Sequence, residues 1–144
     1  MNPGERARRY FQNGCNCSQA VLAAYAESLG LSEETAIKLA TGFGVGLSHG
    51  ATCGAVSGAI MVLGLRHGGG GPQGLEAKRL TYALAQEFMD AFTERFGSPV
   101  CGKILGCDPS TAEGVQEARD KGLFEKVCLE AVGYAAEALQ EADE

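Results

Sequence analysis

Residues 16–30 read NCSQAVLAAYAESLG, and this stretch predicts a buried helix that begins beside a cysteine. Asn16 is of a residue type that caps helix starts, and Gly30 is a typical helix stop. Between them, apolar residues recur at helical spacing and form one stripe: Ala20, Val21, Ala24 and Leu29. The stretch therefore predicts a helix from about Cys17 to Ser28, with the Cys17 thiol in its first turn.

Segments on either side of this stretch have the same helical character. They are expected at Pro3 to Gln12, Ser32 to Thr41, Cys53 to Leu65, Pro72 to Phe96, Pro99 to Leu105, Ser110 to Lys121 and Leu123 to Gln140. The apolar run at residues 60–63 could form a strand, but no second strand is present to pair with it. We therefore expect an all-α, single-domain helical bundle of six to eight helices without a sheet. It spans residues 1–144, with a flexible glycine-rich connection at residues 67–71.

The composition excludes two classes of partner. The net charge of −6 over 144 residues argues against nucleic acid, which needs clustered Lys and Arg. The most apolar run, Ala51 to Leu65, is interrupted by glycines and is too short to span a membrane. The chain opens with a charged segment and not with a secretory signal. We expect a cytoplasmic protein that binds neither membrane nor nucleic acid.

Three of the six cysteines stand where a helix is expected to begin. Cys17 follows Asn16, Cys53 follows Thr52, and Cys101 follows a Ser-Pro pair at residues 98–99. A helix start offers unpaired N–H groups and a partial positive charge, which lower a thiol pKa and favour thiolate. Permanent disulfides are uncommon in a reducing compartment, so these cysteines indicate metal binding or redox chemistry.

The remaining candidate residues have weaker signals. Cys15 forms a Cys-x-Cys pair with Cys17, and the sequence is equally consistent with an exposed cysteine that takes no part in the site. Cys107 lies just past a helix end and could add a thiol near Cys101, whereas Cys128 lies on an apolar stripe, typical of a core residue. His49 precedes Cys53 by four residues and could share a helix face with it.

The glycines around Cys53 favour close backbone contact over nucleotide binding. The loop that contains Gly44 and Gly46 lacks the spacing of phosphate-binding loops, and its N–H groups could instead approach Cys53 or an anionic cluster. Gly54 and Gly58, four residues apart, would let another helix come close. No Cys-x-x-Cys-His motif is present for covalent haem attachment. We expect neither haem nor a bound nucleotide.

Six blocks of sequence form a recognisable set: NCSQAVL at residues 16–22, GFGVG at 42–46, CGAVSG at 53–58, the Gly-Leu pair at 64–65, Cys101 with the Leu-Gly pair at 105–106, and Cys128 with the apolar residues at 132–136. Together they resemble the C_GCAxxG_C_C family of redox-active proteins. The resemblance covers nearly the whole chain. It implies that the four characteristic cysteines are Cys17, Cys53, Cys101 and Cys128. A related domain occurs in split-Soret cytochromes, where cysteines are thought to hold an iron–sulfur cluster.

Three functions are compatible with this set. The first is electron transfer or redox sensing through an iron–sulfur cluster, [2Fe–2S] in our interpretation, because four cysteines equal its ligand number. Cys107, Cys15 and His49 would then be accessory, and Gly44, Gly46, Gly54 and Gly58 would surround the cofactor. The second is a cluster-free thiol–disulfide protein. The third is a zinc or soft-metal binding module.

Two partners follow from the same considerations. A redox-active protein of this size requires a redox partner protein, whose identity the sequence does not reveal. A homodimer is plausible, because the apolar helix faces outnumber what a simple bundle must bury. Whether Cys107 replaces Cys101 or Cys128 as a ligand stays open at this point.

Overall fold

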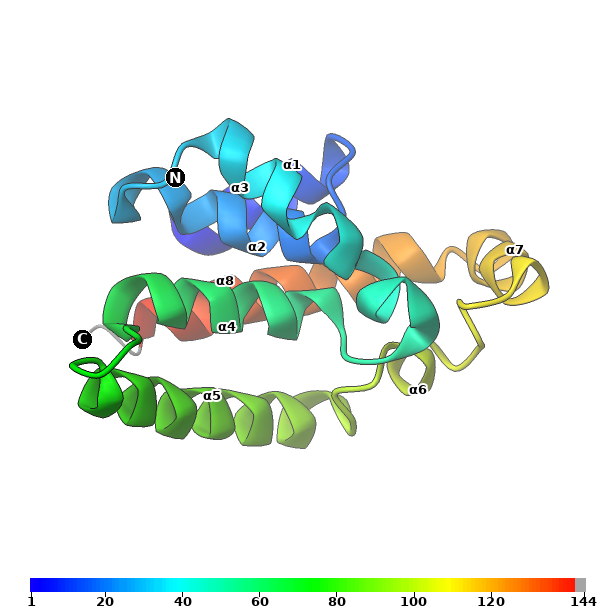
Figure 1. The fold of residues 1–144 in the computed structure, drawn as a ribbon. Coiled ribbons are helices and arrows are strands. Elements are labelled where there is room, and N and C mark those ends of the chain that lie inside the picture. The colour runs from blue at the N-terminus through cyan, green and yellow to red at the C-terminus, as the bar shows by residue number, and fades with distance from the viewer. Residues whose placement is uncertain (142–144) are drawn as a thin grey trace.

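The computed structural model describes residues 1–141 and is all-α (Figure 1). These residues form the α-helices α1 (Pro3–Gln12), α2 (Cys17–Ala26), α3 (Glu33–Ala40), α4 (Gly54–His67), α5 (Leu75–Phe96), α6 (Cys101–Leu105), α7 (Ala112–Asp120) and α8 (Leu129–Glu141). Short 3₁₀ or π turns are η1 (Glu27–Leu29), η2 (Thr41–Phe43), η3 (Gly46–Gly50) and η4 (Phe124–Cys128). The part of the chain described contains no strand, which confirms the predicted single-domain helical bundle. Residues 142–144 of the predicted domain lie outside the described range.

Helix α2 is the centre of the bundle. Nine of its ten residues are buried, and α1, α3, α4 and α8 pack around it. Asn16 caps it with a capping box: the Asn16 side chain accepts from the Gln19 N–H, and the Gln19 side chain accepts from the Asn16 N–H. Because α2 is apolar on nearly every side, tertiary packing decides its stability more than helix propensity does.

Helices α2 and α4 approach each other closely at two glycines. A Cβ on Gly54 would lie 2.9 Å from the Ser18 nitrogen, and one on Gly58 would lie 2.8 Å from the Ser18 carbonyl oxygen. Real Cβ atoms do not come this close to backbone, so only glycine fits at these positions. The prediction that these glycines admit a neighbouring helix is confirmed.

Helix α5 is attached to the bundle mainly through α4 (Figure 1). Its C-terminal half contributes Phe88, Phe92 and Phe96 to an aromatic cluster with Tyr134 of α8. Phe92 is fully buried. The loop at residues 68–74 joins α4 to α5; its flexibility stays a prediction.

The segments just before α4 and α6 are joined by backbone hydrogen bonds. Thr52 and Val100 form an isolated antiparallel bridge. The Cys53 N–H donates to the Pro99 carbonyl at 2.7 Å, and the Cys101 N–H donates to the Ala51 carbonyl at 2.6 Å. These bonds fix two cysteines, distant in sequence, on adjacent segments.

Several predicted boundaries shift by a few residues. Cys53 is the N-cap of α4 rather than its first residue, and α5 begins at Leu75 rather than at Pro72. Helix α7 is capped by Thr111 and not by Ser110, because Ser110 donates from both its N–H and its hydroxyl to Asp108 in a preceding turn. The last helix begins at Leu123 as predicted, but its first part, which ends at Cys128, is the π turn η4.

Within residues 1–141, no helix combines the length and apolarity that crossing a membrane requires.

Candidate functional site

Four cysteines from four separate segments line one cavity of about 130 Å³. They are Cys17, Cys53, Cys101 and Cys128, the four that the family resemblance implies. The rest of the lining is apolar apart from Asn16 and Gly54: Phe11, Val45, Ile104, Leu105, Phe124, Val127 and Ala131. No lysine, arginine, aspartate, glutamate or histidine is among the lining residues. The cavity therefore offers sulfur as its only ionisable donor atom.

Cys17 occupies the first position of α2 and contacts two other thiols of the site. It forms side-chain hydrogen bonds with Cys128 and Cys53, and its side chain is buried. These two contacts, followed by burial, raise the Cys17 pKa well above its ordinary value. The Cys17 thiol thus holds its proton more tightly than an ordinary thiol.

Cys53 is the thiol of the site whose pKa is lowered. The hydrogen bond from Cys17 is the largest cause, and the backbone N–H groups of Ala55 and Val56 add to it. Burial acts in the opposite direction but is outweighed. Cys53 is the N-cap of α4, so its thiol stands beside the partial positive charge of that helix start.

Cys101 begins the five-residue helix α6, but its thiol is not activated. Burial is the main cause that raises its pKa to about 12, followed by the charges of Cys53, Cys128 and Cys107. The expectation that all three helix-start cysteines favour thiolate is therefore wrong for Cys17 and Cys101. Burial raises a thiol pKa by more than the partial charge of a helix start lowers it, unless N–H groups donate to the sulfur directly.

Cys128 lies at the junction of η4 and α8. The wide turn of η4 places residue 128 one position away from where a continuous α-helix would carry it. The side chain is 9% exposed, and Phe124 and Val127 of the same turn also line the cavity. The sequence pattern alone indicated a core residue, and the turn directs the residue toward the other cysteines.

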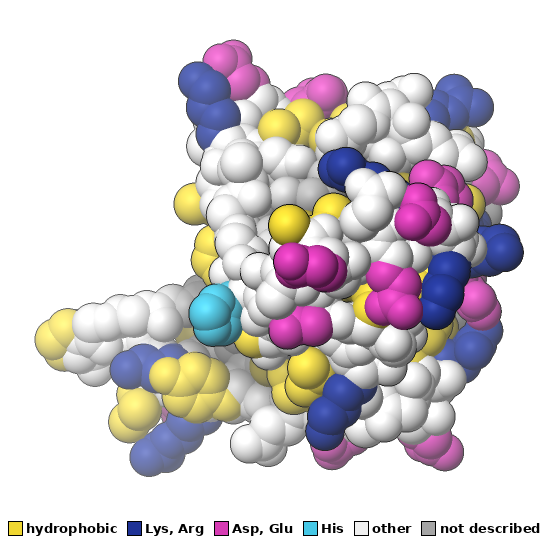
Figure 2. Space-filling model, turned by 90° about the vertical axis from the view of Figure 1, so that its right-hand side faces the viewer, with side chains coloured by type: hydrophobic (Ala, Val, Ile, Leu, Met, Phe, Trp, Pro, Cys, Tyr) yellow, Lys and Arg dark blue, Asp and Glu magenta, His cyan; other side chains and the backbone are white. Residues whose placement is uncertain are grey.

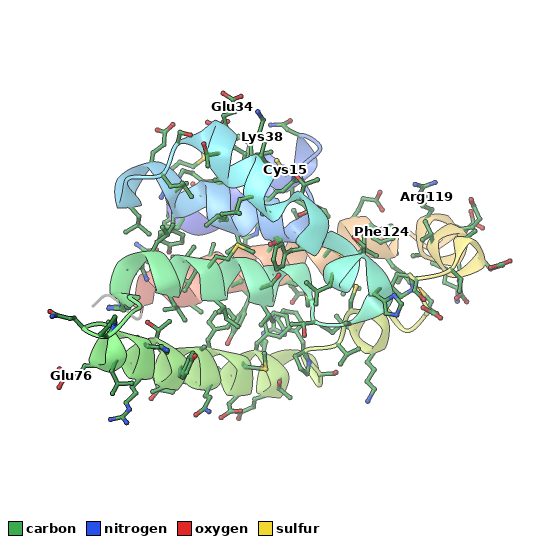
Figure 3. The ribbon with its side chains drawn as sticks, in the orientation of Figure 1. Cys15, Glu34, Lys38, Glu76, Arg119 and Phe124 are labelled. Atoms are coloured by element: carbon green, nitrogen blue, oxygen red, sulfur yellow. The ribbon has the colours of Figure 1, made fainter. Side chains whose placement is uncertain are left out.

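The accessory candidates lie outside the cavity lining. Cys15 is half-buried beside α3, well separated from Phe124 (Figure 3); burial, then the Glu33 charge, raises its pKa. Cys107 is partly exposed just after α6, close enough for its charge to affect Cys101. His49 is exposed in η3. Of these three, Cys107 is the one that bears electrostatically on the site.

The glycines predicted to surround a cofactor have different neighbours. Gly54 lines the cavity. Gly44 lies against the Asn16 side chain, Gly46 against the Ala51 backbone, and Gly58 against Ser18 of α2. Their role around a cofactor stays a prediction.

Residues 45–48 form a left-handed turn beside the cavity that the sequence did not indicate. Val45, Leu47 and Ser48 all have positive φ, which is rare for residues other than glycine and most unusual for β-branched valine. Val45 lines the cavity from this turn. The only sequence signal was the density of glycines around it, which does not specify handedness.

No three His, Cys, Asp or Glu side chains of residues 1–141 are placed to bind one metal ion together. A structural zinc site requires four ligands on a single ion. The side-chain positions around the cavity do not converge on such a point.

Comparison with known proteins identifies one family. Residues 15–142 match the family described as "Putative redox-active protein (C_GCAxxG_C_C)". Neither the curated proteins nor the solved structures contain a match to the chain.

Proposed function

Because the chain belongs to the C_GCAxxG_C_C family of redox-active proteins, we propose that it transfers or senses electrons through an iron–sulfur cluster. The ligands are Cys17, Cys53, Cys101 and Cys128. One observation carries this proposal: these cysteines come from four distant segments and line a single apolar cavity.

The chemistry of the donor set fits such a cluster. Four cysteine thiolates are the usual ligands of [2Fe–2S] and [4Fe–4S] clusters, and sulfur is the only ionisable donor in the cavity lining. Of the two, we propose [2Fe–2S], whose four ligands divide into two pairs on two irons.

The surrounding residues have separate tasks in this proposal. The Cys17 thiol, and then the Ala55 and Val56 N–H groups, lower the Cys53 pKa and so favour its thiolate. The apolar side chains of Phe11, Val45 and Phe124 limit access of water. When bound, the cluster would supply one-electron chemistry at iron. Cys17 and Cys101 must release their protons on binding, since their pKa values are raised without metal.

The burial of the thiols supports electron transfer over exchange of sulfur with a partner. The four side chains are between 5% and 9% exposed. A sulfur that attacks a partner disulfide must reach its surface, and reactive cysteines are therefore partly exposed. An electron can leave a buried centre without direct contact between sulfur and partner.

A second candidate function rests on the contact between Cys17 and Cys53. The lowered pKa of Cys53 and the adjacent Cys17 thiol suit a dithiol that closes to a disulfide. In that reaction the S–S bond forms, two electrons pass to a small-molecule disulfide acceptor, and the protons released on oxidation go to the two acceptor thiols.

Iron and sulfide analysis tests the first function. Protein purified without oxygen, or reconstituted with iron and sulfide, is expected to be coloured and to contain both elements. Serine at any one of the four cavity cysteines should reduce the iron content strongly, whereas Cys15→Ser should retain it. Colourless, iron-free wild-type protein after reconstitution would refute the proposal, and stoichiometric zinc without iron would favour the metal-binding module.

Thiol alkylation separates the second function from the first. Metal-free protein is equilibrated with oxidised or reduced glutathione, and the alkylated mass is measured. A reversible change of two thiols, abolished by Cys17→Ser, supports the dithiol. A constant thiol count across the range rejects it.

A further inference from the structure

Helix α5 has an apolar surface that the rest of the chain leaves uncovered. It is the longest helix, with 22 residues, yet only Phe88 and Phe92 are buried. Leu80 is 49% exposed and Tyr82 is 61% exposed, on opposite sides of the helix. Figure 2 shows a projection at its lower left, at the level of the start of α5, that carries hydrophobic and basic side chains.

One side of α5 borders an open groove of about 350 Å³. Its α5 wall is formed by Leu84, Glu87, Phe88 and Ala91, and Leu63 of α4 with Leu139 of α8 form part of the opposite lining. Leu80 lies one turn before Leu84 on the same face and extends the apolar part of this wall beyond the groove. Apart from Glu87 the lining is apolar, so the groove is suited to receive an exposed leucine from another molecule.

Charge is unevenly distributed along α5. The first half carries Lys78 and Arg79 with a single acid, Glu76, which points away from the bundle in Figure 3. The second half carries Glu87, Asp90 and Glu94, while its one base, Arg95, pairs with Glu130 at 2.6 Å. Within residues 1–141, neither Arg79 nor Glu87 has an ion pair or a side-chain hydrogen bond. The helix therefore has a basic end and an acidic end, both unneutralised.

We propose that α5 is a homodimer interface, in which the α5 helices of two copies pair antiparallel about Ala83. Arg79 and Glu87 stand four residues before and after Ala83, about 6 Å along the axis in each direction. Antiparallel pairing therefore brings Arg79 of each copy opposite Glu87 of the other. The exposed Ala83 at the crossing point permits close approach, and Leu80 of each copy enters the groove of the other.

A second copy fits this surface better than an unrelated protein does, because the surface is complementary to itself. A two-fold interface must present the same patch twice, with each feature facing its counterpart. The groove, the leucine that fills it, and both members of the ion pair all lie on one helix or beside it. The dimer is independent of metal binding, since none of these residues lines the cysteine cavity.

Oligomeric state measured by light scattering on the full chain tests the proposal. Wild-type protein is expected to be a dimer. Leu80→Arg should weaken association at least about tenfold, because it places a charge in the apolar groove. Tyr82→Arg introduces the same residue on the opposite face and should remain dimeric. A monomeric wild type, or dissociation by Tyr82→Arg but not by Leu80→Arg, overturns the proposal.

Charge reversal tests the antiparallel register without altering apolar packing. Arg79→Glu should weaken the dimer, and the double variant Arg79→Glu/Glu87→Arg should restore it, with circular dichroism confirming that each variant is folded. Both positions are exposed, so folding is preserved even where Leu80→Arg unfolds. An Arg79→Glu variant that associates as wild type does, or a double variant that stays dissociated, rejects this pairing.

Discussion

Cys53 and Cys101 stand at the starts of α4 and α6 and line the same cavity, but their thiols have opposite pKa shifts. The Cys53 pKa is lowered chiefly by the neighbouring Cys17 thiol, and the backbone N–H groups of Ala55 and Val56 add to this effect. The Cys101 pKa is raised to about 12 because burial removes solvent from its sulfur. The two segments are bonded to each other through the Thr52 and Val100 bridge, so overall position in the fold does not explain the difference.

The difference shows that standing at a helix start is not sufficient to activate a thiol. Cys53 is the N-cap of α4, and the backbone N–H groups of Ala55 and Val56 in the first turn help to lower its pKa. Cys101 lies one position later, as the first residue of a short helix, and no backbone N–H group is among the causes that shift its pKa. The pKa of a thiol at a helix start therefore depends on which groups lie close to its sulfur, and not on the helix start alone.

The largest expected effect concerns stability at high pH. In metal-free protein, Cys101 favours the folded state while protonated, since its folded pKa lies above the unfolded value. That contribution is complete below the ordinary cysteine pKa and is lost as the pH rises through about 12, by at most about 4 kcal/mol before screening by solvent is counted. Urea unfolding across this range measures it.

The serine variants separate the two thiols in that experiment. Cys101→Ser should reduce the decline without abolishing it, because the Cys17 pKa is also raised. Cys53→Ser should leave most of the loss of stability at high pH. A thiol whose pKa is lowered by folding stabilises the folded state at high pH, and this contribution is lost only as the pH falls. Equal declines in wild type and Cys101→Ser would contradict the contrast between the two helix starts.

One glycine follows each of these two cysteines, and alanine at each of them should change the free energy of unfolding by an intermediate amount. A Cβ on Gly54 would lie 2.9 Å from the Ser18 nitrogen, whereas one on Gly102 would lie 3.3 Å from the Cys107 carbonyl oxygen. We expect Gly54→Ala to lower the free energy of unfolding by about 1–3 kcal/mol through overpacking. Gly102→Ala should stay within about 1 kcal/mol of wild type. Thermal unfolding of both variants measures the difference, and equal losses would contradict it.

The smallest expected change in unfolding free energy concerns the start of α2, the third helix start beside the cavity. Asn16→Ala removes the capping box of α2 and should cost about 1 kcal/mol of unfolding free energy. Thr111→Ala removes the cap of α7, away from the cavity, and should cost a similar amount. Denaturant unfolding compares the two. Because Asn16 also lines the cavity, only Asn16→Ala should alter iron content, and an equal change in both variants would argue against a role in the site.

Most of the fold could be predicted from local sequence. Helical periodicity, caps such as Asn16 and stops such as Gly30 place the helices within a few residues, because these signals act between neighbours in the chain. The cap of α7 shows the limit of such local signals. Ser110 and Thr111 are both capping residue types, but Ser110 donates to Asp108 in the preceding turn, so Thr111 caps the helix. The left-handed turn at Val45 left no comparable signal.

The cysteines of the site could be predicted from the sequence, but their shared cavity and their pKa shifts could not. The helix starts indicated Cys17, Cys53 and Cys101, and the family resemblance added Cys128. That these four share one cavity follows from packing of α2, α4, α6 and η4, which no spacing in the sequence expresses. The apolar lining from Phe11 and Phe124 was not foreseen for the same reason.

The sequence by itself determined that the chain is helical, where its helices begin, and which cysteines stand at those starts, since these properties depend on residues a few positions apart. Only the tertiary structure decided which thiol pKa is lowered and which are raised. A thiol pKa depends on lost solvent and on nearby charges and donors, and for Cys17, Cys53 and Cys101 these come largely from segments distant in the chain.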